Sequence, residues 1–156
     1  MIIRSIREED AEQFLNLCRQ LDAETQFMLL EPGERKTTLE EQRTQIGILL
    51  QQDNQTIFVA EQNNRLVGYL AASREPFIRS KHSAYLVIGI LQAFTRQGVG
   101  TQLFQRLEVW AKQQHIYRLE LTVMTHNVAG IALYKKQVSY RGNEKTLIAN
   151  KWPICR

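Results

Sequence analysis

The sequence predicts an α/β fold in which a mixed, mostly antiparallel central sheet is flanked by helices. Segments of helical periodicity alternate with segments typical of strands along the 156 residues. A nearly all-apolar run, residues 84–91, leads into a glycine loop and then into an amphipathic segment, which is the order of a buried strand, a loop and a helix. The predicted order of elements is β-α-α-β-β-β-α-β-α, with an atypical C-terminal end.

The first half of the chain is predicted to contain a strand, two helices and a hairpin. Thr38 and Glu41 have the spacing of a capping box, which indicates the start of the second helix. We expect this helix to turn Leu39, Ile46, Leu49 and Leu50 inward. The elements are a strand at 2–6, helices at 8–21 and 39–51, and hairpin strands at 56–61 and 66–73.

The second half is predicted to begin with the strand at 84–91, buried on both faces. A helix follows the glycine loop, then a strand at 119–124 and a short helix at 127–136 with Asn127 as its N-cap. Residues 137–156 lose this patterning, and only 146–149 indicate a strand. A chain of this length is expected to form a single domain, residues 1–156.

Composition excludes several classes of function. The net charge of +4 is mild and the basic residues are scattered, so nucleic acid is not an expected partner. No apolar run approaches the ~20 residues that span a bilayer, so no membrane association is expected. The two cysteines, Cys18 and Cys155, give neither a disulfide framework nor a metal-binding spacing, so no metal is expected and a cytoplasmic location is the default.

The glycine loop, residues 96–101, predicts a site for a phosphate-bearing ligand. Backbone N–H groups at a helix N-terminus lack intrahelical partners, and the helix dipole adds positive potential there. Gly98 and Gly100 let the main chain approach a ligand closely. Both nucleotide-binding patterns match poorly: no Lys-Ser/Thr pair follows, as a P-loop needs, and Leu103 stands where the third glycine of a dinucleotide fingerprint belongs. A tight turn without a ligand is the alternative interpretation.

Two segments in this order resemble a known family. Residues 87–103, Val-Ile-Gly-Ile-Leu-Gln-Ala-Phe-Thr-Arg-Gln-Gly-Val-Gly-Thr-Gln-Leu, resemble the acetyl-CoA-binding motif of the GNAT superfamily of N-acetyltransferases. Residues 127–136, Asn-Val-Ala-Gly-Ile-Ala-Leu-Tyr-Lys-Lys, are similar to the family's Asn-x-x-Ala-x-x-Leu-Tyr-x-Lys helix. One helix and one strand separate the two motifs, as in the family. The core motifs therefore lie within residues 84–136.

The resemblance implies an acetyl-CoA cosubstrate and a GNAT-like acyl-CoA N-acyltransferase fold. The pantetheine arm is expected beside the strand residues Ile88, Gly89 and Ile90, and Asn127 is expected to contact the cofactor as well as cap its helix. Thr95 stands where the family usually has Gln or Arg. The diphosphate is expected on the loop residues Arg96, Gln97, Gly98, Val99, Gly100 and Thr101.

The resemblance also implies a reaction. Tyr134 resembles the family's general acid, and a phenol of pKa near ~10 can protonate a departing thiolate of pKa about 8.5. The amine is expected to attack the thioester directly, because Cys18 lies on an apolar helix face and is expected to be inert. The general base stays open: Thr122 stands where some relatives have glutamate, and Glu120, Glu31, Glu75 and His82 are weak candidates. Loss of the amine's proton through ordered water is another route.

Two alternatives share the same loop. One is a non-catalytic acyl-CoA-binding or sensing module on the same fold, and the other is a nucleotide-binding regulator. The acceptor, a small-molecule or peptide amine, stays open, as does a homodimer. Val138 and Ser139 stand where the family has Gly-Phe, and we interpret residues 137–156 as atypical, a loss of pattern consistent with a change of reading frame.

Overall fold

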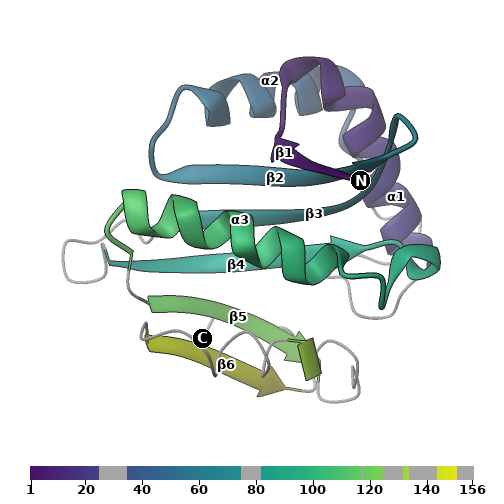
Figure 1. Ribbon diagram of the computed structural model, residues 1–156. Helices are drawn as coiled ribbons and strands as arrows, with labels where there is room; N and C mark the ends of the chain where they lie inside the picture. The colour runs from purple at the N-terminus through teal and green to yellow at the C-terminus, as the bar shows by residue number, and fades with distance from the viewer. Residues whose placement is uncertain (25–34, 75–81, 117, 125–131, 134–143, 151–156) are drawn as a thin grey trace.

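The computed structural model describes residues 1–24, 35–74, 82–116, 118–124, 132–133 and 144–150 (Figure 1). The predicted order of elements is confirmed from the first strand through β5. The elements are β1 (Ile2–Ser5), the 3-10 turn η1 (Glu8–Asp10), α1 (Ala11–Glu24), α2 (Leu39–Leu50), β2 (Gln55–Gln62), β3 (Arg65–Arg74), β4 (Ser83–Ile90), the 3-10 turn η3 (Gln92–Phe94), α3 (Val99–Gln113), β5 (Arg118–Met124) and β6 (Glu144–Asn150).

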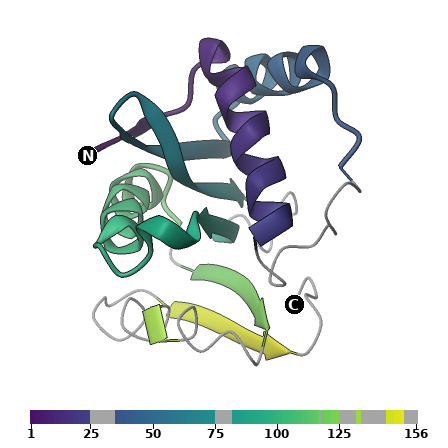
Figure 2. The same cartoon turned by 90° about the vertical axis from the view of Figure 1, so that its right-hand side faces the viewer.

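The strands form one mixed sheet in the order β1-β2-β3-β4-β5-β6. The pairs from β1 to β4 are antiparallel, whereas β4–β5 and β5–β6 are parallel. Figures 1 and 2 show α1 and α2 on one face of the sheet and α3 on the other. The prediction of a mixed, mostly antiparallel sheet flanked by helices is therefore confirmed.

Local sequence accounts for the turns and helix ends of the N-terminal half. Asn63 and Asn64 join β2 to β3 with φ of 52° and 62°, the left-handed conformation that a two-residue hairpin turn requires and that Asn tolerates. Thr38 caps α2 by accepting a hydrogen bond from the N–H of Glu41 at 3.2 Å, as the capping-box spacing predicts.

The core lies between the sheet and the helices on both faces. Among its most buried side chains are Val59 and Leu70 from the sheet and Leu107 from α3. Two predictions of burial are wrong. Leu50 is 48% exposed because α2 ends there, at the rim of a cavity beside the sheet edge. Val87 in β4 is 41% exposed, so this strand is not buried on both faces.

The C-terminal part is described only in places. Of the predicted helix at 127–136, residues 132–133 are described and are helical. β6 covers the predicted segment 146–149 and extends beyond it at both ends. It pairs with β5 in parallel from Arg118↔Glu144 to Met124↔Asn150. Within the described ranges, no helix is both long and apolar enough to cross a membrane.

A buried ion pair fixes β1 to the start of α1. Two guanidinium nitrogens of Arg4 donate to the Asp10 carboxylate at 2.7 and 2.9 Å, and the N–H of Arg7 donates to it at 2.8 Å. Asp10 is 5% exposed. The hydrogen bonds from Arg4, ahead of the opposing effect of burial, hold the pKa of Asp10 below its ordinary value.

We predict that Asp10→Asn lowers the free energy of unfolding at pH 7 by about 1.5 to 3 kcal/mol, because the half-buried Arg4 loses the nearer of its two carboxylate partners and retains Glu61, at 3.3 Å. The folded pKa of Asp10 is depressed, so its stabilisation is complete above the unfolded pKa of about 3.9 and is lost as pH falls through the folded value. Urea unfolding from pH 7 to pH 2 measures this, and the two proteins should converge at the acid end.

Glu9→Gln is the matched control. It removes a carboxylate from the exposed Arg7–Glu9 pair, whose N···O distance is 3.5 Å, and should change the free energy of unfolding by less than about 0.5 kcal/mol. Equal losses in the two variants would contradict a specific role for the Arg4–Asp10 pair.

Candidate cofactor-binding site

The strands β4 and β5 diverge after three residue pairs. β4 pairs with β3 from Ala84 to Ile90, but among the described residues it pairs with β5 only from Ser83↔Arg118 to Tyr85↔Glu120. Beyond Tyr85 the edge of β4 that faces away from β3 has no described strand beside it. We call this edge, residues 86–90, the open edge of β4.

Alternation along the strand decides which backbone groups reach the open edge. The N–H of Leu91, just after β4, donates to the carbonyl of Val67 in β3 at 2.9 Å. Because successive residues of a strand point their N–H groups to opposite edges, the N–H of Gly89 also faces β3. The N–H groups of Ile88 and Ile90 therefore face the open edge, where a bound chain could accept hydrogen bonds from them.

The glycine loop places a second set of backbone donors at the end of this strand. The N–H of Gln102 donates to the carbonyl of Gly98 at 3.0 Å, closing the first turn of α3. Gly98 is the N-cap, and no side chain caps the helix. The N–H groups of Val99, Gly100 and Thr101 thus lack intrahelical partners, and the helix dipole adds positive potential at the same point.

The loop before α3 is held by its own side chains. The Thr95 hydroxyl donates to the carbonyl of Gln92 at 2.8 Å, and the Gln97 amide donates to the carbonyl of Ala93 at 3.0 Å. Arg96 is exposed and has a φ of 61°, a left-handed conformation that is unusual for arginine. Arg96 lies two residues before the N-cap Gly98, so the loop carries a positive charge close in sequence to the uncapped helix N-terminus, which suits an anion.

The two loop glycines serve different purposes. Gly98 has a φ of 85°, and a Cβ there would meet no atom closer than Nε2 of Gln102 at 4.0 Å, so its backbone conformation, not crowding, favours glycine. Gly100 is buried, and a Cβ there would lie 2.7 Å from Cδ2 of Leu133 and 3.3 Å from Cδ1 of Ile90. Gly100 is thus the point at which α3, the open edge of β4 and the helical residue Leu133 meet.

The structure brings together most of the predicted cofactor site. Ile88 and Ile90 lie on the open edge, and Cδ1 of Ile90 lies beside Gly100, one of the predicted loop residues Arg96 to Thr101. Asn127 and Tyr134 lie outside the described residues. Leu133, next to Tyr134 in the sequence, packs at the Gly100 position.

The packing of Gly89 was not predicted from the sequence. A Cβ at Gly89 would lie 2.8 Å from Cδ1 of Leu21 and 3.0 Å from Cε1 of Tyr69. Gly89 therefore lets α1 and the Tyr69 ring approach β4 on the face opposite α3. The centroids of the Tyr69 and Phe14 rings lie 5.2 Å apart in an edge-to-face arrangement. An isolated glycine inside an otherwise aliphatic strand is a signal for such a close approach.

Glu120 lies where β4 and β5 part. It is opposite Tyr85 in the last pair between the two strands, and it is 3% exposed. Its Oε1 lies 2.8 Å from Nε of Arg118. Of the other base candidates, His82 is exposed with Nδ1 3.0 Å from the carbonyl of His115, and Glu31 and Glu75 lie outside the described residues.

Cys18 is buried, and burial raises the pKa of its thiol to about 11. A thiol in this state is a poor nucleophile at neutral pH, in agreement with the sequence-based expectation that it is inert. Within the described part of the chain, no three His, Cys, Asp or Glu side chains gather as metal ligands would.

Comparison with known proteins places the chain in a family. The profile of the Acetyltransferase (GNAT) family matches residues 10–140, and the protein belongs to this family. The resemblance seen in the two sequence motifs is therefore confirmed. No match was found among curated proteins.

Solved structures agree with this assignment. A GNAT-family acetyltransferase from Streptococcus pneumoniae is 29% identical with a TM-score of 0.81, covering 86% of this chain and 81% of its own. A ribosomal-protein-alanine N-acetyltransferase from Brucella melitensis is 24% identical with a TM-score of 0.76, covering 88% and 83%. The yncA protein of Salmonella typhimurium, solved with its cofactor acetyl-CoA, is 17% identical with a TM-score of 0.75, covering 87% and 77%. The last two establish the shared fold.

We predict that Gly100→Ala and Leu133→Ala are energetically coupled. The new methyl group overlaps Leu133, and truncating Leu133 removes the overlap. Gly100→Ala should therefore lower the free energy of unfolding by about 1 kcal/mol or more beyond its effect in the Leu133→Ala background. Urea unfolding of the two single variants and the double variant measures this coupling.

Gly98→Ala is the control for this cycle. It should cost about 1 kcal/mol through its left-handed φ, and this cost should add to that of Leu133→Ala within about 0.5 kcal/mol, because the two sites do not touch. Additivity at Gly100 as well would show that Leu133 does not pack against that position.

Proposed function

We propose that the protein is an N-acetyltransferase that moves an acetyl group from acetyl-CoA to a primary amine by direct attack. The observation that carries the proposal is that two sets of backbone N–H donors lie next to each other. One set is on the open edge of β4 and the other is at the uncapped N-terminus of α3, and the two meet where Ile90 lies beside Gly100. Membership of the GNAT family supports the same assignment.

The donor sets suit the two polar parts of an acyl-CoA. The diphosphate carries the charge that an uncapped helix N-terminus favours, and Arg96 adds a charge-assisted contact at the rim. The pantetheine arm carries amides that can pair with the N–H and C=O groups of Ile88 and Ile90, as an added strand would. The same N–H groups can polarise the thioester carbonyl and stabilise negative charge on its oxygen.

Two proton transfers complete the reaction. The attacking amine must lose a proton, and Tyr134 is proposed to protonate the departing CoA sulfur. Glu120 is the described carboxylate nearest to the parting of β4 and β5, but its burial and its contact with Arg118 make proton removal through ordered water the simpler route. The acceptor is a small-molecule or peptide amine. Cytoplasmic location and homodimer formation stay predictions from the sequence and the resemblance.

The alternative is a non-catalytic acyl-CoA-binding module on the same fold. It shares the loop and the open edge with the enzyme and differs in having no chemical step. Binding experiments test what the two functions share, and turnover separates them.

We predict that Gly98→Asp binds CoA at least about tenfold more weakly than Gly98→Asn. Asn and Asp both tolerate a positive φ and can cap the helix, so the two variants differ by one negative charge at the proposed diphosphate site. A tenfold change in affinity corresponds to about 1.4 kcal/mol. Calorimetry with CoA measures the difference.

Pantetheine, which lacks the diphosphate, provides the control ligand. It should bind Gly98→Asp and Gly98→Asn with equal affinity, because neither variant changes the open edge of β4. If CoA also fails to distinguish the two variants, the diphosphate does not lie on this loop.

We predict that Tyr134→Phe lowers the turnover number by about 10²-fold or more while the affinity for CoA stays unchanged, because one general acid is removed and the ring is retained. Release of free thiol, followed with a panel of amines, measures turnover. Tyr140→Phe removes a phenolic hydroxyl outside the two motifs and should retain full activity.

The outcomes separate the two functions. If the wild-type chain binds CoA and releases no thiol with any amine, the non-catalytic module is favoured. If it turns over and Tyr134→Phe is as fast as the wild type, another group protonates the sulfur.

A further inference from the structure

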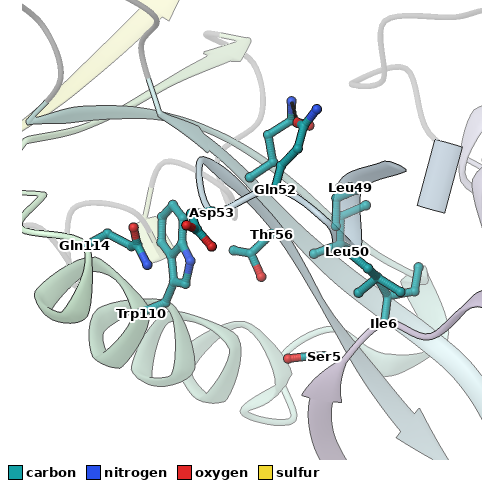
Figure 3. Close-up of a pocket in the computed structure, with 11 residues that line it drawn as sticks. Ser5, Ile6, Leu49, Leu50, Gln52, Asp53, Thr56, Trp110 and Gln114 are labelled. Atoms are coloured by element: carbon teal, nitrogen blue, oxygen red, sulfur yellow. Dashed lines mark hydrogen bonds between the residues drawn. The ribbon is translucent and has the colours of Figure 1, made fainter. Parts of the chain in front are cut away.

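A second cavity lies at the sheet edge, away from the proposed acetyl-CoA site. Its volume is about 190 Å³, and it is bounded by the end of β1, the end of α2, the start of β2 and the last turns of α3 (Figure 3). Trp110, which lines it, follows Val99 by eleven residues on α3, about 16 Å along the helix axis. The proposed function makes no use of this cavity.

The cavity exists because β1 is shorter than β2. The last residue pair between these strands is Ser5↔Phe58, and the N–H of Ile6 donates to the carbonyl of Ile57 at 3.0 Å. The first residues of β2 therefore have no described strand beside them on this edge. α2 on one face and α3 on the other extend past the end of β1 and form the walls.

The two ends of the cavity differ in chemistry. Figure 3 shows Trp110 and Asp53 together at one end, and Ile6, Leu49 and Leu50 at the other. Of the described residues that line the cavity, Asp53 is the one ionisable group, although the chain as a whole carries a net charge of +4. Asp53 makes no ion pair with any described residue.

Three independent features favour a cation at the Asp53 end. The carboxylate supplies a full negative charge. α2 ends at Leu50, directly before this end, and has no basic residue in its last turn, so the negative end of its dipole is uncompensated. The indole of Trp110, which is half-buried, offers the aromatic face that attracts cations most strongly.

The remaining groups suit an ammonium on an aliphatic stem. Ser5 and Thr56 line the same cavity, and their hydroxyl oxygens can accept hydrogen bonds from an –NH₃⁺ group, which has three donors and no acceptor. The aliphatic side chains at the other end can cover a short hydrocarbon chain.

We propose that this cavity binds an organic ammonium, an amino group carried on a short aliphatic chain, with the nitrogen between Asp53 and Trp110 and the chain against Leu49 and Leu50. A free alkylamine and the side chain of a lysine share this chemistry. The proposal is independent of the acetyltransferase reaction, because binding is measured without acetyl-CoA.

The test uses the Trp152→Phe protein, in which Trp110 is the remaining tryptophan. The indole N–H signal of Trp110 in ¹H–¹⁵N correlation spectra is followed while n-butylammonium chloride is added at constant ionic strength. We expect a saturable shift with a dissociation constant on the order of 1–10 mM, as befits so small a ligand. The neutral isostere n-butanol should bind at least about fivefold more weakly.

Two charge variants make the test specific. Asp53→Asn should weaken n-butylammonium binding at least about threefold and leave n-butanol binding unchanged. Glu12→Gln, which removes an exposed carboxylate from α1, should change neither. The proposal is overturned if n-butylammonium gives no saturable shift, if n-butanol binds equally well, or if the two variants lose affinity to the same extent.

A capped peptide, acetyl-Gly-Lys-Gly-amide, distinguishes the two sources of the ammonium. Tighter binding of this peptide than of n-butylammonium assigns the cavity to the lysine of a protein partner, because the peptide backbone then adds contacts at the open part of β2. Equal or weaker binding assigns it to a free amine.

Discussion

The proposed activity depends on the divergence of β4 and β5 after Tyr85 and Glu120. A strand inside a sheet normally satisfies its backbone groups on both edges, and a buried N–H without a partner is costly. β4 pairs with β3 on one side from Ala84 to Ile90. On the other side, Ile88 and Ile90 present donors at a position where a ligand's amides and carbonyls can take the place of a strand. The same divergence that would weaken a purely structural sheet thus creates a recognition edge.

The glycine loop is informative about function because it lies at the end of the open edge of β4. An uncapped helix N-terminus is a weak signal alone, because every helix has one. Here, the N-cap is a glycine with no side chain to satisfy the first donors, and the contact between Ile90 and the Gly100 position joins it to the open edge. In the proposed function, this packing sets the distance between the diphosphate and the thioester, which is the form of preorganisation that group transfer requires.

The two ends of α3 belong to different regions of the protein. At its start, glycines allow backbone, Leu133 and Ile90 to meet closely. At its end, Trp110 reaches beyond the short strand β1 to a cavity whose one ionisable group among the described residues is Asp53. The two proposed sites favour opposite charges, an anion at the N-terminus of α3 and a cation beside the C-terminus of α2, in agreement with the directions of the helix dipoles.

Much of this protein was predictable from neighbouring residues alone. The Asn63–Asn64 turn, the Thr38 cap and the order strand, glycine loop, helix depend on interactions within a few positions, which periodicity and turn chemistry report directly. The two GNAT motifs then indicated the family. Only the tertiary structure decided which N–H groups of β4 face the open edge, that Gly100 accommodates Leu133 and Gly89 accommodates Tyr69, and that Leu50 and Val87 are exposed. These outcomes depend on where distant segments pack and on how far two strands stay paired, and a local pattern carries no information about either.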